Sequence, residues 1–90
     1  MSIKDKFELV KKAKELQKKL RSEVVNVSSG AVKIVINGEQ KVQSVTVNKD
    51  MVDVENLEKL EREIKSALEQ AITRSQQIAA NIAKGMGIGF

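Results

Sequence analysis

The sequence predicts one α+β domain, built from a long helix, a three-stranded antiparallel meander and a long C-terminal helix, which forms a homodimer with projecting helices. Three observations support this fold class. Apolar residues follow a helical period at both ends of the 90-residue chain, they alternate with a period of two in its middle, and an Asn-Gly pair separates two alternating runs. We expect residues 1–84 to form the domain and residues 85–90 a flexible, glycine-rich tail with an apolar end.

The first helix is expected over residues 3–22. Its apolar residues step by four, three and four positions along one face: Leu9, Ala13, Leu16 and Leu20. Ser2 stands before this run and Asp5 follows three residues later, so the two can form a weak capping box. Charged residues fill most of the other positions, which predicts a helix with much of its surface in water.

The three strands are expected within residues 24–48. One face of the sheet must be covered, and it carries Val32, Ile34, Ile36, Val45 and Val47. Ser29-Gly30 predicts the first turn. Asn37-Gly38 predicts the second as a type I′ turn, in which both central residues take positive φ. Val35 lies on the opposite face and suggests that this face is partly buried too.

The last helix is expected to begin after Asp53 as N-cap and to end before Gly85 as stop signal. Its apolar seam recurs every seven residues at Leu57, Ile64, Ala71 and Ile78. The helix would be about 46 Å long, whereas a compact domain of this size has a radius of gyration of about 12 Å. We therefore expect the helix to overhang its domain and to contact a second copy, through the sheets, the helix seams or both.

The composition excludes several classes of function. The chain has no His and no Cys, so it cannot assemble a Ser-His-Asp or Cys-His arrangement or a zinc-thiolate site. No catalytic, metal-binding or cofactor-binding residue is assigned, and neither an enzyme activity nor a small-molecule substrate is expected. The apolar runs are too short to cross a bilayer, and no secretory signal opens the chain. These features predict a cytoplasmic protein without a membrane partner.

Positive charge is concentrated at the start of the chain. Lys and Arg number 16 against 12 Asp and Glu, for a net charge of +4. Residues 1–23 carry eight basic and four acidic side chains, residues 50–69 carry seven acidic and three basic ones, and residues 70–90 have no acid. A lysine-rich helix face can bind DNA phosphates. On the charge pattern alone, a solubilising surface with Glu8–Lys12 and Glu15–Lys19 pairs is the favoured interpretation.

If nucleic acid binds, we expect duplex DNA held through its phosphates. Only Phe7 and Phe90 are aromatic, which disfavours stacking on single strands or RNA, and the three arginines offer little base-edge readout. The candidate DNA-binding residues are Lys4, Lys11, Lys12, Lys18, Lys19, Arg21, Arg74 and Lys84.

Residues along nearly the whole chain resemble the YbaB/EbfC family of bacterial nucleoid-associated proteins. The first segment that carries the resemblance is the Lys- and Gln-rich helix from Phe7 to Leu20. The second is the stretch Ser29-Gly-Ala-Val-Lys-Ile-Val-Ile-Asn-Gly38, which is similar to the family's G-x-V-x-V-x-x-N-G element. It is followed by Val45-Thr-Val47 and then by the helical run Ile64-Lys-Ser-Ala-Leu-Glu-Gln-Ala-Ile72. The sequence departs from the family in lacking its Met- and Gly-rich leader, and in having Asn48-Lys49-Asp50 where Asp-Pro is frequent.

The resemblance implies a small homodimer in which the sheets join and the helices project, which binds DNA with little or modest sequence preference in the nucleoid and has no catalytic residues. An alternative hypothesis is a protein–protein interaction module, in which the projecting helices and the apolar tail dock a protein partner and the basic charge serves solubility.

Overall fold

The computed structural model describes residues 2–87 and confirms the predicted α+β class. Its elements are α1 (Ile3–Ser22), β1 (Val24–Ser29), β2 (Val32–Asn37), β3 (Val42–Val47), the short 3-10 helix η1 (Lys49–Met51) and α2 (Leu57–Gly85). Met1 and residues 88–90 lie outside the described residues, and with them the end of the predicted tail. The division into a domain 1–84 and a tail 85–90 stays a prediction.

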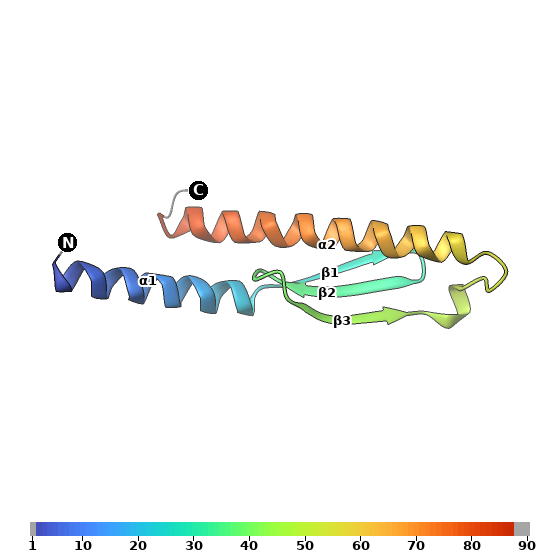
Figure 1. Cartoon of the computed structure of the whole chain (residues 1–90), viewed down its shortest axis with the longest axis horizontal. Helices are drawn as coiled ribbons and strands as arrows, with labels where there is room; N and C mark the ends of the chain where they lie inside the picture. Colours follow the sequence, from blue (N-terminus) through green and yellow to red (C-terminus); the bar gives the residue numbers. More distant parts are fainter. Residues whose placement is uncertain (1, 88–90) are drawn as a thin grey trace.

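The three strands form the predicted antiparallel meander in the order β1-β2-β3. Val27 pairs with Ile34, and Ile34 pairs with Val45, so these three residues share one face of the sheet. The first turn lies where Ser29-Gly30 predicts it, with Gly30 at φ 54°. α2 runs along the face that carries Val27 and Ile34 (Figure 1), and the molecule is elongated, with extents of 64 × 19 × 16 Å.

The hydrophobic core lies between α2 and the first two strands. It consists of Val25, Val27, Val32, Ile34, Ile36, Ala67 and Ala71, with the half-buried Leu60 and Ile78 beside it. The two alanines face the sheet because they recur at a helical spacing of four residues, and their short side chains let the helix axis approach the strands closely. Burial of each Val or Ile stabilises the fold by roughly 1.5–3 kcal/mol.

Within one chain, the predicted cover of the apolar face does not reach β3. Val45 and Val47 lie on the face that α2 covers over the other strands, yet they are 57 % and 45 % exposed. The contacts of α2 with the sheet are made to β1 and β2. A helix is about 10 Å wide and strands lie about 4.8 Å apart, so one helix covers about two strands. The third strand is left open. Val35, on the other face, is half-buried, in line with the prediction for that face.

The second hairpin is present, but the predicted type I′ turn is wrong. Gln40, and not the Asn37-Gly38 pair, takes positive φ, at 63°. The Gln40 N–H donates to the Asn37 carbonyl oxygen over 3.1 Å. The Asn37 side-chain oxygen accepts from the backbone N–H groups of Glu39 (2.9 Å) and Lys41 (3.1 Å), so the turn is organised by the Asn37 side chain.

Gly38 is required for close contact with α1. Its N–H donates to the carbonyl oxygens of Leu20 (2.8 Å) and Glu23 (3.0 Å). A Cβ at position 38 would lie 2.8 Å from the Leu20 oxygen and 3.1 Å from the Leu20 Cα. Gly38 therefore fixes the C-terminal end of α1 against the hairpin between β2 and β3.

The prediction of Asp53 as N-cap of the last helix is also wrong. α2 begins at Leu57, and its N-cap is Asn56, whose side chain makes no capping hydrogen bond. Asp53 instead closes a turn before the helix, because its side chain accepts from the Glu55 N–H and its carbonyl accepts from the Asn56 N–H, both over 3.0 Å. At the other end, the helix includes Gly85.

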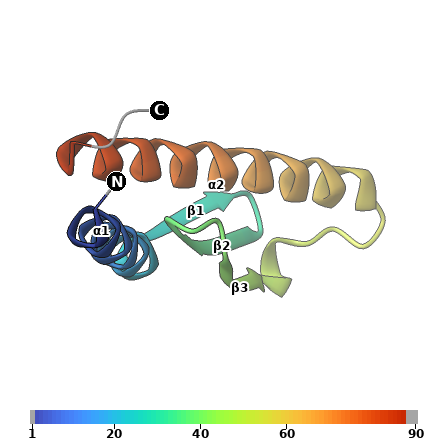
Figure 2. The same cartoon turned by 60° about the vertical axis from the view of Figure 1, so that its left-hand side comes forward.

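α1 is an exposed arm that leaves the sheet at the hairpin between β2 and β3. The predicted capping box is confirmed: the Ser2 hydroxyl accepts from the Asp5 N–H, and the Asp5 carboxylate accepts from the Ser2 N–H. α1, all of which the structure describes, has no buried residue. It is seen nearly end-on in Figure 2 while α2 still crosses the view, so the two helices diverge. With both helices extending past the sheet, the radius of gyration is 17.8 Å.

The close approach at Gly38 gives a stability prediction. Gly38→Ala should lower the free energy of unfolding by about 1–3 kcal/mol, since the added methyl group overlaps the Leu20 backbone. Urea denaturation followed by circular dichroism at the helix band measures this loss. Gly85→Ala is the matched control, because a Cβ there meets nothing within 4 Å. An equal loss in both variants would show that the Gly38 contact contributes nothing specific.

Candidate nucleic-acid interface

The predicted lysines of α1 form two rows along the helix. Lys4, Lys11 and Lys18 recur every seven residues and therefore share one line of the helix, and Lys12 and Lys19 form a second line. All five side chains are exposed. Seven residues correspond to about 10 Å of helix, so the first row spans about 21 Å.

These lysines are free of the acidic partners that a solubilising surface would give them. Neither the Glu8–Lys12 nor the Glu15–Lys19 ion pair is formed within the described residues 2–87, where the ion pairs are Arg21–Glu39 and the exposed Lys65–Glu69. The charges of the two rows are therefore available to a ligand.

Arg21 differs from the lysines because it already has a partner. Its Nε donates to the Glu39 carboxylate over 2.9 Å, which links the end of α1 to the hairpin between β2 and β3. This hydrogen bond lowers the pKa of the Glu39 carboxyl, against the opposing effect of its partial burial. The Arg21 guanidinium thus serves first to hold α1 in place, and its proposed contact to DNA competes with this ion pair.

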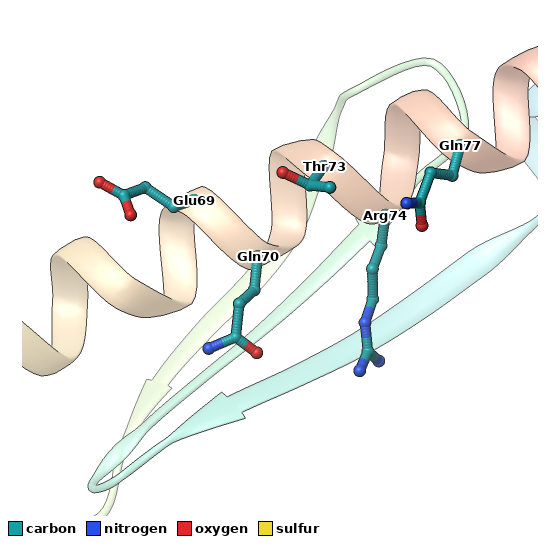
Figure 3. A pocket seen from close by; sticks show the side chains of 5 residues that line it. All are labelled: Glu69, Gln70, Thr73, Arg74 and Gln77. Carbon is teal, nitrogen blue, oxygen red and sulfur yellow. The ribbon is translucent and has the colours of Figure 1, made fainter.

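α2 contributes two of the predicted residues at separate places. Arg74 lies halfway along the helix and Lys84 in its last turn, so about 15 Å of helix separates them. Arg74 borders a shallow hollow on the outer side of α2, lined by Glu69, Gln70, Thr73, Arg74 and Gln77 (Figure 3). In that view the Gln70 and Arg74 side chains point towards β1, and Glu69 points away from them.

The amide and hydroxyl side chains around Arg74 were not among the predicted site residues. Gln70, Thr73 and Gln77 are exposed beside it. The feature of the sequence that could have indicated these residues is the absence of acidic residues after Glu69. From Gln70 to Gln77 these amide, hydroxyl and guanidinium donors suit contacts to phosphate and sugar oxygens, whereas Glu69 at the edge of the hollow repels them.

The fold separates charge along its long axis. α1 and the C-terminal end of α2 lie at one end of the molecule, and η1 and the N-terminal end of α2 at the other (Figure 1). The first of these ends contains the basic residues 1–23 and Lys84, and the second contains most of the acidic segment 50–69. An anionic polymer is therefore attracted to one end and repelled from the other.

Other kinds of site find little support in the described residues. Within residues 2–87, no group of three or more acidic side chains converges as metal ligands would. No helix in this part of the chain has the length and apolarity needed to cross a bilayer.

Comparison with known proteins adds three findings. A sequence model of the YbaB/EbfC DNA-binding family matches residues 3–90. A nucleoid-associated protein of Syntrophobacter fumaroxidans is 36 % identical over 83 residues, which cover 86 % of this chain and 76 % of that protein. One of Caldanaerobacter subterraneus is 33 % identical over 91 residues, which cover 98 % and 81 %.

A solved structure shares the fold. An uncharacterized Helicobacter pylori protein, HP0035, superposes with a TM-score of 0.76 at 20 % identity, over 96 % of this chain and 97 % of that one. At this level of identity the similarity establishes the arrangement of helices and strands.

The Arg21–Glu39 pair gives a pH prediction. Since the pKa of Glu39 is lowered in the folded state, the pair stabilises the protein above the carboxyl's unfolded-state pKa, and this contribution is lost as the pH falls through the folded-state value. Glu39→Gln should therefore lower Tm at about pH 7 and leave it nearly unchanged at about pH 3.

Thermal unfolding by circular dichroism at the two pH values measures the difference. Glu15→Gln serves as control, since Glu15 is exposed on α1. A Tm difference between Glu39→Gln and the parent protein that is equal at both pH values would contradict a role for the ion pair.

Proposed function

The chain belongs to the YbaB/EbfC DNA-binding family, and from this premise we propose that it binds duplex DNA as a homodimer, mainly through phosphate contacts and with little sequence specificity. The observation that carries the proposal is the pair of exposed lysine rows on α1, which have no acidic partners within the described residues. The relatives are named nucleoid-associated proteins, and we place this chain in the nucleoid of the cytoplasm as well.

The chemistry of the side chains supports phosphate contacts over base readout. Lysine ammonium groups act as point charges that neutralise phosphates and release counterions, and this type of binding is independent of sequence. Bidentate readout of guanine is best suited to the planar, fork-shaped guanidinium of arginine. The chain has three arginines, of which Arg21 is paired with Glu39. The DNA-binding residues proposed are those predicted from the sequence: Lys4, Lys11, Lys12, Lys18, Lys19, Arg21, Arg74 and Lys84.

The exposed apolar side chains support a homodimer. A 90-residue chain buries a limited share of its surface, and this one leaves the inner face of β3 half exposed. Closed two-fold dimers are the commonest way to cover such a face. A dimer also doubles the number of lysine rows that one protein presents to a duplex, which raises its affinity through multivalency. The proposal keeps residues 1–84 as the domain and residues 85–90 as its tail. The proposed function involves no catalytic step.

A second candidate function is docking of a different protein. It is favoured by Ile3 and Phe7, which are among the most exposed large apolar residues of the described chain. A protein partner that stays bound after nuclease treatment, together with no DNA binding at low salt, would favour this candidate over the first.

The dimer proposal makes a direct prediction. Sedimentation equilibrium at micromolar concentrations should give twice the chain mass of 10.0 kDa. Dilution should shift the average towards one chain mass, since the association is reversible. A single chain mass over the whole concentration range would contradict the homodimer without bearing on DNA binding.

The lysine rows make a second prediction. Replacing Lys11, Lys12, Lys18 and Lys19 with Gln should weaken binding to a labelled random duplex and flatten the slope of log affinity against log salt, by about 0.9 for each phosphate that the protein no longer neutralises. Fluorescence anisotropy over a salt series measures both, with circular dichroism to check folding.

The matched control changes the same amount of charge elsewhere. Gln at Lys33, Lys41, Lys59 and Lys65 also removes four charges, all from exposed side chains outside α1. The control should retain the parent salt slope. Equal weakening in both variants would assign the binding to net charge, and an unchanged affinity in the first variant would remove α1 from the site.

A further inference from the structure

The Asn37-Gly38 pair is able to modify itself, a property that DNA binding does not use. Asparagine side chains are chemically labile. Of the five asparagines in the sequence, only Asn37 is followed by glycine. The backbone nitrogen of a glycine can attack the side-chain carbonyl carbon of the asparagine before it, because glycine has no Cβ to hinder the approach. Asn37-Gly38 is therefore the pair in this sequence at which ring closure is sterically favoured.

The reaction at this pair needs only water. Base removes the proton of the Gly38 N–H, a bond forms between that nitrogen and the Asn37 Cγ, and the Cγ–Nδ2 bond breaks. The leaving nitrogen takes a proton from solvent and departs as ammonia, which leaves a cyclic imide. Water then opens the imide at either carbonyl. One opening gives aspartate, and the other gives isoaspartate, in which the main chain runs through the former side chain.

The fold keeps the attacking nitrogen protonated. Gly38 is buried, and its N–H donates to the carbonyl oxygens of Leu20 (2.8 Å) and Glu23 (3.0 Å). Loss of the proton would place a negative nitrogen against two carbonyl oxygens, and this repulsion is strong where the local dielectric is low. Burial also keeps base away from the N–H group. Leu20 lies in α1 and Glu23 is its C-cap, so the end of α1 provides this protection.

The turn that contains Asn37 polarises the carbon that would be attacked. The Asn37 Oδ1 accepts from the backbone N–H groups of Glu39 (2.9 Å) and Lys41 (3.1 Å). Two N–H donors on one carbonyl oxygen draw charge from its carbon and stabilise an oxyanion that develops there. The side-chain amide is thus prepared for attack. The contact between Gly38 and α1 is what prevents the reaction in the folded chain.

The end of α1 is attached by few contacts. They are the two hydrogen bonds of Gly38, the Arg21–Glu39 pair, in which the Arg21 side chain is 61 % exposed, and packing against α2. α1, all of which the structure describes, has no buried residue. Segments with few buried contacts open more often than the core. α1 can therefore detach while the Ser75 hydroxyl still holds the Asn37 carbonyl oxygen, over 2.7 Å.

We propose that Asn37-Gly38 is a self-modification site, protected while the end of α1 is attached and converted to a cyclic imide when α1 detaches. The modification persists after α1 returns. Isoaspartate adds the former Cβ to the main chain before Gly38, so the Gly38 N–H is displaced from the carbonyls of Leu20 and Glu23, and α1 no longer attaches in the same direction. The proposal is independent of DNA binding and of the homodimer.

The first experiment compares the folded and the unfolded chain. The protein is kept in a warm, mildly alkaline buffer with or without urea and then digested with trypsin, which cleaves after Lys33 and Lys41 and isolates Asn37 in the peptide 34–41. Mass spectrometry measures conversion of amide to acid, with Asn48 in the peptide 42–49 as internal control. Conversion of Asn37 should be at least about tenfold slower in the folded chain, because only the open fraction reacts. Equal rates would overturn the proposed protection.

The same measurement in urea identifies the attacking atom. Gly38→Ala should slow the conversion of Asn37 severalfold, because a Cβ hinders ring closure. Electron-based fragmentation should detect isoaspartate in the parent chain, since direct hydrolysis of the side-chain amide yields aspartate alone. An absence of isoaspartate, or a rate that Gly38→Ala leaves unchanged, would rule out the imide and with it the proposed site.

A substitution on α1 tests its part in the protection. Arg21→Gln removes the pair with Glu39 and should raise the rate of the folded chain severalfold, whereas Lys65→Gln removes the exposed Lys65–Glu69 pair and should keep the parent rate. Circular dichroism confirms that both variants are folded.

The dependence on urea separates detachment of α1 from global unfolding. The raised rate should change little with urea below the unfolding transition, because local opening exposes little surface. A parent-like rate in Arg21→Gln, or a rate with the full urea dependence of global unfolding, would contradict control by α1.

Discussion

The arrangement of the whole chain depends on the buried corner at Asn37 and Gly38. Asn37 is 1 % exposed, and its carbonyl oxygen accepts from the buried Ser75 hydroxyl of α2 over 2.7 Å. The adjacent Gly38 N–H is shared between the carbonyls of Leu20 and Glu23 at the end of α1. Two consecutive residues thus connect the sheet to both helices. Because unpaired buried polar groups are costly, these contacts fix where α2 crosses the sheet and in which direction α1 leaves it.

The alternation of apolar residues predicted the strands and the buried face correctly, but not how far the cover extends. Val45 has the same place in the pattern as Ile34, its cross-strand partner, yet only Ile34 is buried. A period of two records which side of a strand is apolar, whatever covers it. The width of the covering helix decides the burial, and this is a property of the assembled fold. An apolar residue that is exposed in one chain fits the same alternating pattern when a second chain covers it.

Features of the candidate site that depend on neighbouring residues of one helix could be predicted from the sequence. Features that depend on contacts between distant parts of the chain could not. The rows of α1 follow from lysines at seven-residue steps, which a sequence displays directly. The Arg21–Glu39 pair joins residues 18 positions apart. Because of this pair, Arg21 holds α1 to the hairpin and is not a free cation. The turn at Gln40 was missed because the Asn37 side chain, which accepts from two backbone N–H groups, replaced the usual requirement for two residues of positive φ.

The attachment of α1 at one end has a mechanical consequence. An uninterrupted helix of 20 residues is about 30 Å long, and this one is held near its C-terminal end by a few hydrogen bonds, one ion pair and packing against α2. It acts as a lever: a tilt of about 10° at the base displaces the tip by about 5 Å. A small change of angle at Gly38 would therefore become a large change in the separation of distant charges. In the proposed DNA complex, such changes of angle would let the same protein follow a straight duplex and a curved one alike.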